Sequence, residues 1–258
     1  FLYLYTMKQW SLMLCLLGTL GLPGVLDVAK SFLGVPYVSG TLESEGKEYL
    51  IVDTTGMDCT TFVELSVARY MEARDSDLTF EQHVQCLRYR QGRVDGYLSR
   101  LHYFTDWVNE NVRRDVWYEL GSMSDNAYMW RADTLQLCFM SAHPDSYPYL
   151  KAHAWAVDSL RTMEKSFWGY PVSYIDKSFL NLPSDSLPIR DGDILALVTT
   201  VEGLDVSHLG FAVWQNEKLH LMHASMNHGR VVIDERTLYD YLKTRKGCPG
   251  VRVVRLRE

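Results

Sequence analysis

The stretch Gly56-Met57-Asp58-Cys59-Thr60-Thr61-Phe62-Val63-Glu64 decides how this sequence is interpreted. Asp58 is a typical helix N-cap, and the residues after it have the spacing of a helix with an apolar side. Cys59 is therefore expected in the first helical turn, where unpaired N–H groups and about half a positive charge favour a thiolate. We expect a thiol that ionises below the usual pKa of about 8.5 and acts as a nucleophile. A small core residue is the alternative for a single free cysteine.

A second stretch, residues 207–225, has the pattern of a β-hairpin whose turn lies within residues 215–218. Alternation along its first strand separates two sets of side chains, with Leu209, Phe211 and Val213 on one face and His208, Gly210 and Ala212 on the other. Apart from His208, the second face carries only the small residues Gly210 and Ala212, and we call it the bare face. We expect the helix that begins at Cys59 to pack against that bare face.

The turn decides which later histidine joins His208. A turn centred within residues 215–218 sets Gly210 opposite His223 and Val213 opposite His220. His223 then shares the face of His208, while His220 falls on the apolar face. A slip of one residue would exchange the two histidines. Cys59, His208 and His223 are the resulting candidate catalytic residues.

The order of these motifs resembles the NlpC/p60 cell-wall cysteine hydrolases, which have a papain-like fold. The resemblance is carried by Asp58-Cys59, Asp191-Gly192-Asp193, His208-Leu209-Gly210-Phe211 and His223-Ala224-Ser225, with Phe32-Leu33-Gly34-Val35-Pro36-Tyr37 ahead of the cysteine. A narrower resemblance, to the N-acetylmuramoyl-L-alanine amidase-like branch, is carried by Gly40-Thr41-Leu42-Glu43, Arg88-Tyr89-Arg90 and Tyr97-Leu98-Ser99-Arg100-Leu101-His102-Tyr103-Phe104. The chain departs from the common pattern at Thr60, where many members have Ser, and in a long insertion before His208.

The resemblance implies a cofactor-free hydrolase that uses a Cys-His-His triad and a thioester intermediate. The implied substrate is peptidoglycan or its stem peptide, cut either at the muramoyl-to-alanine amide or at a γ-D-glutamyl link. It also implies that Tyr37 lies beside the nucleophile and that Asp58 helps to bind a free amine of the peptide, although a helix cap is an equally good role for Asp58. Within the insertion, Arg100 and His102 are candidates for substrate contact, and a solvated helix face is the alternative.

The expected fold class is α+β, papain-like, with the cysteine-bearing helix packed on a C-terminal antiparallel sheet. The pattern predicts helices at about 25–33, 59–71, 80–90 and 101–112, and strands at 49–53, 194–200, 208–214, 219–223, 231–233 and 251–256. Residues 25–258 are expected to form a single catalytic domain with an insertion at about 91–188. The part of this insertion from residue 115 onward shows no repeat.

Residues 1–24 contain an apolar run from Trp10 to Leu22 that ends at Pro23-Gly24. This length is typical of a signal-peptide core and is short for a membrane span, so export to the periplasm or cell envelope is expected. A buried helix on the back of the domain is the alternative, because no pair of small residues marks a cleavage site.

Composition limits the remaining functions. A formal net charge of −6 over 258 residues argues against nucleic-acid binding, although Arg88, Arg90, Arg93 and Arg100 form a local basic cluster. The five cysteines are irregularly spaced and imply neither a disulfide framework nor a zinc motif, and we expect a monomer. Two alternatives remain for the chemistry: acyl transfer through the same thioester, and a metal hydrolase that uses His208, His220, His223 and His228.

Overall fold

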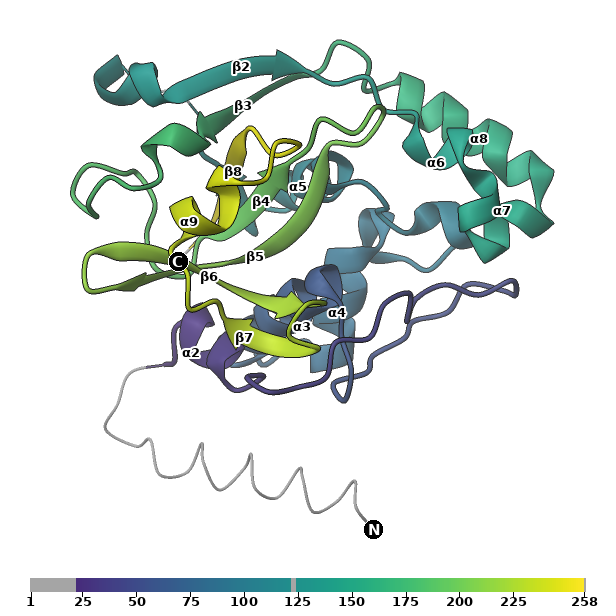
Figure 1. The fold of residues 1–258 in the computed structure, drawn as a ribbon. Coiled ribbons are helices and arrows are strands. Elements are labelled where there is room, and N and C mark those ends of the chain that lie inside the picture. Colours follow the sequence, from purple (N-terminus) through teal and green to yellow (C-terminus); the bar gives the residue numbers. More distant parts are fainter. Residues whose placement is uncertain (1–21, 122–123, 258) are drawn as a thin grey trace.

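A single antiparallel sheet organises the molecule (Figure 1). The computed structural model describes residues 22–121 and 124–257, and among these residues the sheet has eight strands in the order β2-β3-β8-β4-β5-β6-β7, with β1 also paired to β8. The strands are β1 Trp117–Glu119, β2 Trp130–Thr134, β3 Pro171–Asp176, β4 Ile194–Val198, β5 Val206–Gln215, β6 Lys218–Ser225, β7 Arg230–Ile233 and β8 Gly250–Leu256.

Helices lie on both sides of the sheet and in a lobe at one end of it (Figure 1). The α-helices are α2 Val25–Lys30, α3 Cys59–Glu72, α4 Phe80–Arg88, α5 Phe104–Arg113, α6 Phe139–Ala142, α7 Pro148–Ala152, α8 Ala154–Lys165 and α9 Leu238–Lys243. Short 3₁₀ turns cover Arg90–Gly92, Tyr97–Ser99, Ser124–Met129, Pro144–Ser146 and Lys177–Phe179. The mixed α+β class with an antiparallel sheet is thus confirmed.

Helix α3 packs on the bulky face of β5, which corrects the expectation that it would cover the bare face. Its Phe62 is fully buried and meets Phe211 of β5 edge to face, with ring centroids 5.6 Å apart. Leu209 and Val213 belong to the same apolar cluster. Large side chains on both elements bury more area than a Gly and Ala surface would, and burial of one Phe side chain contributes roughly 1.5–3 kcal/mol.

The opposite face of the sheet is covered by α9. Ala212 of β5 and Leu221 of β6 pack there against Leu238 and Leu242 of α9. The sheet therefore separates two apolar clusters, with α3 on one side and α9 on the other (Figure 1).

Residues 91–188 are more ordered than their irregular sequence indicated. They supply β1, β2 and β3 to the sheet, and α6 to α8 to the lobe, whose own apolar cluster includes Tyr97, Tyr103, Tyr149 and Leu160. Residues 49–53, expected as a strand, belong to no strand. The expected signal-like or buried segment, residues 1–24, lies outside the described residues as far as residue 21.

Candidate active site

Cys59 is the first residue of α3, as the sequence predicted. Asp58 caps the helix by accepting a hydrogen bond from the Thr61 N–H at 2.8 Å, and the Thr61 hydroxyl accepts one from the Asp58 N–H at 2.9 Å. The backbone N–H of Leu209 on β5 donates a hydrogen bond to the Cys59 sulfur. The thiol therefore contacts the backbone of the residue that directly follows His208.

The end of the β5–β6 ladder explains how the thiol reaches β5. The pairing between these strands runs from Gln215 and Lys218 to Phe211 and Met222. Beyond that point the N–H of Leu209 bonds to the thiol of Cys59. The cysteine therefore lies where the two strands of the hairpin separate.

The pKa of the Cys59 thiol differs from the expected direction. Burial raises it to about 11, and the nearby charge of Asp58 adds to the increase. Hydrogen bonds from the Leu209 N–H, the Thr60 side chain and the Cys59 N–H act in the opposite direction but do not outweigh burial. The expectation of an ionised thiol in the resting protein is therefore wrong, because desolvation exceeds the effect of the helix N-terminus.

The hairpin register is the predicted one. Asn216 and Glu217 form a two-residue turn with φ of 50° and 59°, and Val213 pairs with His220. His208 and His223 meet, with 2.6 Å between Nε2 of His208 and Nδ1 of His223 and their rings nearly perpendicular.

Gly210 lies where β5 comes close to the backbone of β6 next to His223. A Cβ atom at Gly210 would lie 2.5 Å from the Met222 carbonyl oxygen and 3.1 Å from Cβ of His223. The first distance is shorter than a Cβ atom can approach a backbone oxygen, so a side chain at this position would force the two strands apart.

Both imidazoles of this pair are held neutral near pH 7. Burial lowers the pKa of His208 to about 3, with further decreases from His223 and Arg245. Burial likewise lowers the pKa of His223 to about 4, although the Asp234 carboxylate acts in the opposite direction. A neutral imidazole can accept a proton, which is what a general base requires.

Asp234 is a residue that the sequence interpretation did not single out. It follows β7, is 2% exposed, and its Oδ2 lies 3.8 Å from Nε2 of His223. Burial alone would raise the pKa of Asp234, but hydrogen bonds and charge from Arg236 hold it below its ordinary value. Nδ1 of His220 donates a hydrogen bond to the Asp234 carbonyl oxygen at 3.0 Å, so its contact is with the backbone of this segment.

Tyr37 lies near Cys59 and Asp58. Its backbone forms a bridge with Met57, and its N–H donates to the Gly229 carbonyl at 2.9 Å. Burial raises the pKa of Tyr37, and the neighbouring Cys59 and Asp58 raise it further. The segment that precedes Cys59 is thereby joined to the turn after β6.

Arg100 and His102 have internal partners. Arg100 is 7% exposed, donates to Glu43 at 2.7 Å and lies 3.2 Å from a carboxylate oxygen of Glu48. His102 lies 2.9 Å from the Tyr97 carbonyl oxygen through Nε2, and its ring lies over Tyr97. These contacts join the segment around Glu43 to residues 97–102, and a role of Arg100 or His102 in substrate contact stays a prediction.

The neighbouring arginines are also paired within the protein. Arg88 and Glu64 form an ion pair at 2.8 Å in which both side chains are 2% exposed, and Arg90 binds Asp106 at 2.6 Å. The local basic cluster is therefore largely neutralised by carboxylates. Local ion pairing explains this part of the sequence without an anion ligand.

The remaining cysteines and potential metal ligands form no second site among the described residues. Cys59, Cys86, Cys138 and Cys248 are free thiols. Within residues 22–121 and 124–257, no group of three His, Cys, Asp or Glu side chains is arranged to hold a metal ion, and His228 contacts Ser225 at 2.9 Å. No helix in this part of the chain is long and apolar enough to cross a membrane.

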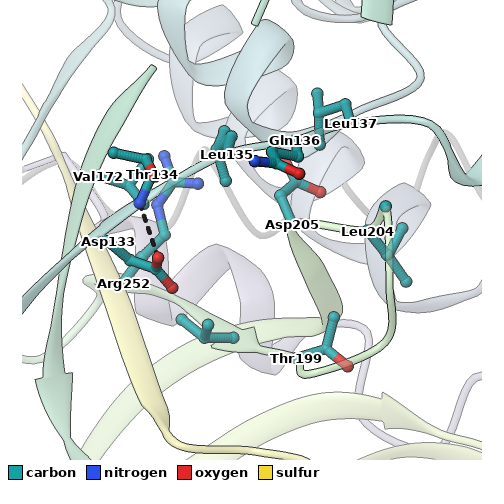
Figure 2. A pocket seen from close by; sticks show the side chains of 12 residues that line it. Asp133, Thr134, Leu135, Gln136, Leu137, Val172, Thr199, Leu204, Asp205 and Arg252 are labelled. Atoms are coloured by element: carbon teal, nitrogen blue, oxygen red, sulfur yellow. Dashed lines mark hydrogen bonds between the residues drawn. The ribbon is translucent and has the colours of Figure 1, made fainter. Parts of the chain in front are cut away.

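A hollow of about 150 Å³ lies between the segment after β2 and the loop that joins β4 to β5 (Figure 2). Asp205 and Arg252 belong to its wall, and both are hydrogen-bonded to Thr105. Its lining does not include Cys59, His208 or His223. The candidate catalytic residues therefore lie outside this hollow.

The chain is an α+β protein in which Cys59 begins a helix and contacts the backbone of β5, and in which His208 and His223 meet at 2.6 Å on two adjacent strands. Residues 27–250 match the family described as AmiA-like, N-acetylmuramoyl-L-alanine amidase-like. The chain belongs to this N-acetylmuramoyl-L-alanine amidase-like family, and this membership indicates a hydrolase. A search of curated proteins found no match.

Several solved structures are similar to this chain. A crystal structure of an N-acetylmuramoyl-L-alanine amidase from Bacteroides uniformis is 37% identical, covers 91% of this chain and 98% of its own, and has a TM-score of 0.82. A structure from Bacteroides fragilis described as a candidate xylanase is 40% identical, with coverages of 89% and 99% and a TM-score of 0.80. A protein from Legionella pneumophila, 20% identical with coverages of 94% and 92% and a TM-score of 0.68, shares the fold.

Proposed function

We propose that this protein is an NlpC/p60-type cysteine hydrolase that cleaves the amide between N-acetylmuramic acid and L-alanine in peptidoglycan or its fragments. Cys59 is the nucleophile, His208 the acid–base group and His223 its positioning partner. The observation that carries the proposal is the 2.6 Å contact between His208 and His223, together with the hydrogen bond that the N–H of Leu209, the residue after His208, donates to the thiol of Cys59. Family membership and the name of the Bacteroides uniformis structure favour this amide over others.

Several structural features support a papain-like arrangement. The cysteine begins a helix that packs on an antiparallel sheet, and the histidines come from two adjacent strands of that sheet. The register of β4 with β5 shifts directly before His208, and a β-bulge of this kind can re-aim a side chain next to an active site. An amidase of the cell wall would work in the periplasm or cell envelope, after export.

The proposed reaction begins with a neutral thiol and a neutral imidazole. Nε2 of His208 is engaged by His223, so Nδ1 of His208 takes the thiol proton as the sulfur of Cys59 attacks the amide carbon. The imidazolium then protonates the nitrogen of the leaving amine as the C–N bond breaks, which leaves a thioester. Water attacks the thioester, His208 takes a proton from it, and the thiol is re-formed with release of the acid.

The start of α3 also offers a donor for the tetrahedral intermediate. The backbone N–H of Cys59 lies in the first turn, where amide groups have no helical partner. Such an N–H stabilises the developing oxyanion. Asp58 and Tyr37 flank the thiol and are the first candidates to contact the peptide, with Asp58 able to attract a free amine.

Mass analysis of products tests which bond is cut. The assay uses purified muropeptides and free stem peptides as parallel substrates, with xylan as a third. We expect a free tri- or tetrapeptide that begins with L-alanine, a sugar that carries the lactyl carboxylate, and no change in the free peptides. Cleavage of free stem peptides would identify an endopeptidase, transfer to an added amine would identify an acyltransferase, and turnover of xylan alone would overturn the proposal.

A further inference from the structure

Asp234 is a buried carboxylate that lies behind the histidine pair. It comes directly after β7 and is 2% exposed. Arg236 donates to both of its oxygens, from Nε to Oδ1 at 2.9 Å and from Nη2 to Oδ2 at 2.8 Å. The position of Asp234 is fixed further through its backbone, because its N–H donates to the Leu221 carbonyl at 2.9 Å and its own carbonyl contacts His220.

His223 presents an unsatisfied nitrogen to this carboxylate. Its Nδ1 is taken by His208, while its Nε2 is buried and has no hydrogen-bond partner among the described residues. Oδ2 of Asp234 lies 3.8 Å from that Nε2. This distance exceeds a hydrogen bond, but a carboxylate so close in a buried site still favours a proton on the facing nitrogen.

We propose that Asp234 is a positioning residue that sets the tautomer of both histidines. A proton on Nε2 of His223 leaves its Nδ1 as an acceptor, so His208 must donate from Nε2. Nδ1 of His208 is then unprotonated and can receive the thiol proton of Cys59. This inference rests on the proposed cysteine mechanism and adds a fourth residue to it.

The surroundings of His223 contain other charged groups that act on the same proton. The titratable or charged groups that face it are His208, His228, Asp234, Arg236, Tyr241 and Arg245. The arginines and His228 oppose a positive charge on His223, whereas Asp234 favours one. Among these groups, Asp234 is the one whose charge favours a proton on Nε2 of His223, and the neighbouring cations oppose it.

The chain offers a matched control in Asp193. This residue is also 2% exposed, receives two hydrogen bonds from one arginine, Arg255, and accepts a further bond from the backbone N–H of Arg190. It does not contact either histidine of the pair. Asp193→Asn should thus reproduce the structural cost of Asp234→Asn without its effect on the tautomer.

The experiment is NMR of protein labelled with ¹⁵N in its histidine side chains, combined with steady-state kinetics on muropeptide. In the wild type we expect the proton of His223 on Nε2 and that of His208 also on Nε2. In Asp234→Asn, an amide N–H facing Nε2 favours the other tautomer of His223, and kcat should fall by about 10–100-fold with little change in KM, because a wrong tautomer next to a catalytic histidine is costly. Asp193→Asn should keep the wild-type tautomers and kcat.

Contrary results are separable from failure of the proposed function. A wild-type spectrum with the His223 proton on Nδ1 overturns the proposal, and needs neither substrate nor a folded variant. Equal losses of kcat in Asp234→Asn and Asp193→Asn, with tautomers unchanged, would also overturn it and leave a purely structural role. A wild type that cuts no muropeptide would instead refute the proposed activity while the tautomers still test the role of Asp234.

Discussion

His220 and His223 lie three residues apart on β6, both are buried, and they serve opposite faces of the sheet. His223 reaches His208 at 2.6 Å on the face that α9 covers, where its ring also meets Tyr241. His220 is paired with Val213 of the apolar face and contacts the Asp234 backbone. The comparison teaches that strand parity decides which of the two histidines reaches His208 and which one contacts the backbone of the segment after β7.

The largest expected effects concern the histidine pair. His208→Ala removes the acid–base group, and activity on muropeptide should fall by about 10²–10⁴-fold. His223→Ala removes only its positioning partner and should cost less, on the order of 10–100-fold, with the fold retained. Steady-state kinetics and circular dichroism on both variants check this order. A folded His223→Ala protein with wild-type activity would break the comparison.

The same pair should make stability depend on pH. The folded pKa values of about 3 and about 4 lie below the unfolded value of about 6.5, so the unfolded chain binds protons that the folded one does not. The stability from the neutral pair is complete above pH 6.5, is lost progressively as the pH falls below that value, and stops falling once the folded protein also binds the protons, at about pH 4 and pH 3. Each proton contributes a slope of roughly 1 kcal/mol per pH unit in the free energy of unfolding.

Urea unfolding between pH 7 and pH 4 measures this slope. His208→Asn has one titrating group fewer, so its free energy of unfolding should depend less steeply on pH than that of the wild type. Identical slopes in the two proteins would show that this histidine is not held neutral by burial.

The smallest effect on activity is expected from the other histidine. His220→Ala breaks the contact with the Asp234 carbonyl and should lower the free energy of unfolding by about 1–3 kcal/mol. Turnover at saturating substrate should stay within a few-fold of the wild type, because the pair of His208 and His223 is intact. Loss of turnover in a folded His220→Ala protein, with activity kept in His223→Ala, would exchange the two roles.

Much of this site could be predicted from local sequence signals. The cap at Asp58 placed Cys59, and the two-residue turn at Asn216 and Glu217 fixed which histidine joins His208. Alternation could not tell which face α3 covers, since it only sorts side chains into two sets. Burial of the thiol was equally invisible to the sequence, and it reversed the expected direction of the Cys59 pKa.

Other parts depend on contacts between distant residues. β2 is an edge strand with four exposed residues of five, so it lacks the alternating pattern of a half-buried strand. Asp234 follows a strand and looks like an ordinary turn residue. Only the folded chain brings it to His223, because β7 pairs with β6 and carries the residue after it past the imidazole.

The central claim is that hydrolysis proceeds through the thiol of Cys59. Cleavage of muropeptide by the wild type and by Cys59→Ser, each with and without a metal chelator, tests it most directly. A serine hydroxyl is a far poorer nucleophile here, so Cys59→Ser should be nearly inactive while the chelator leaves the wild type unaffected. Activity that survives the serine substitution, disappears with chelator and returns with added zinc would contradict the account and favour a metal hydrolase.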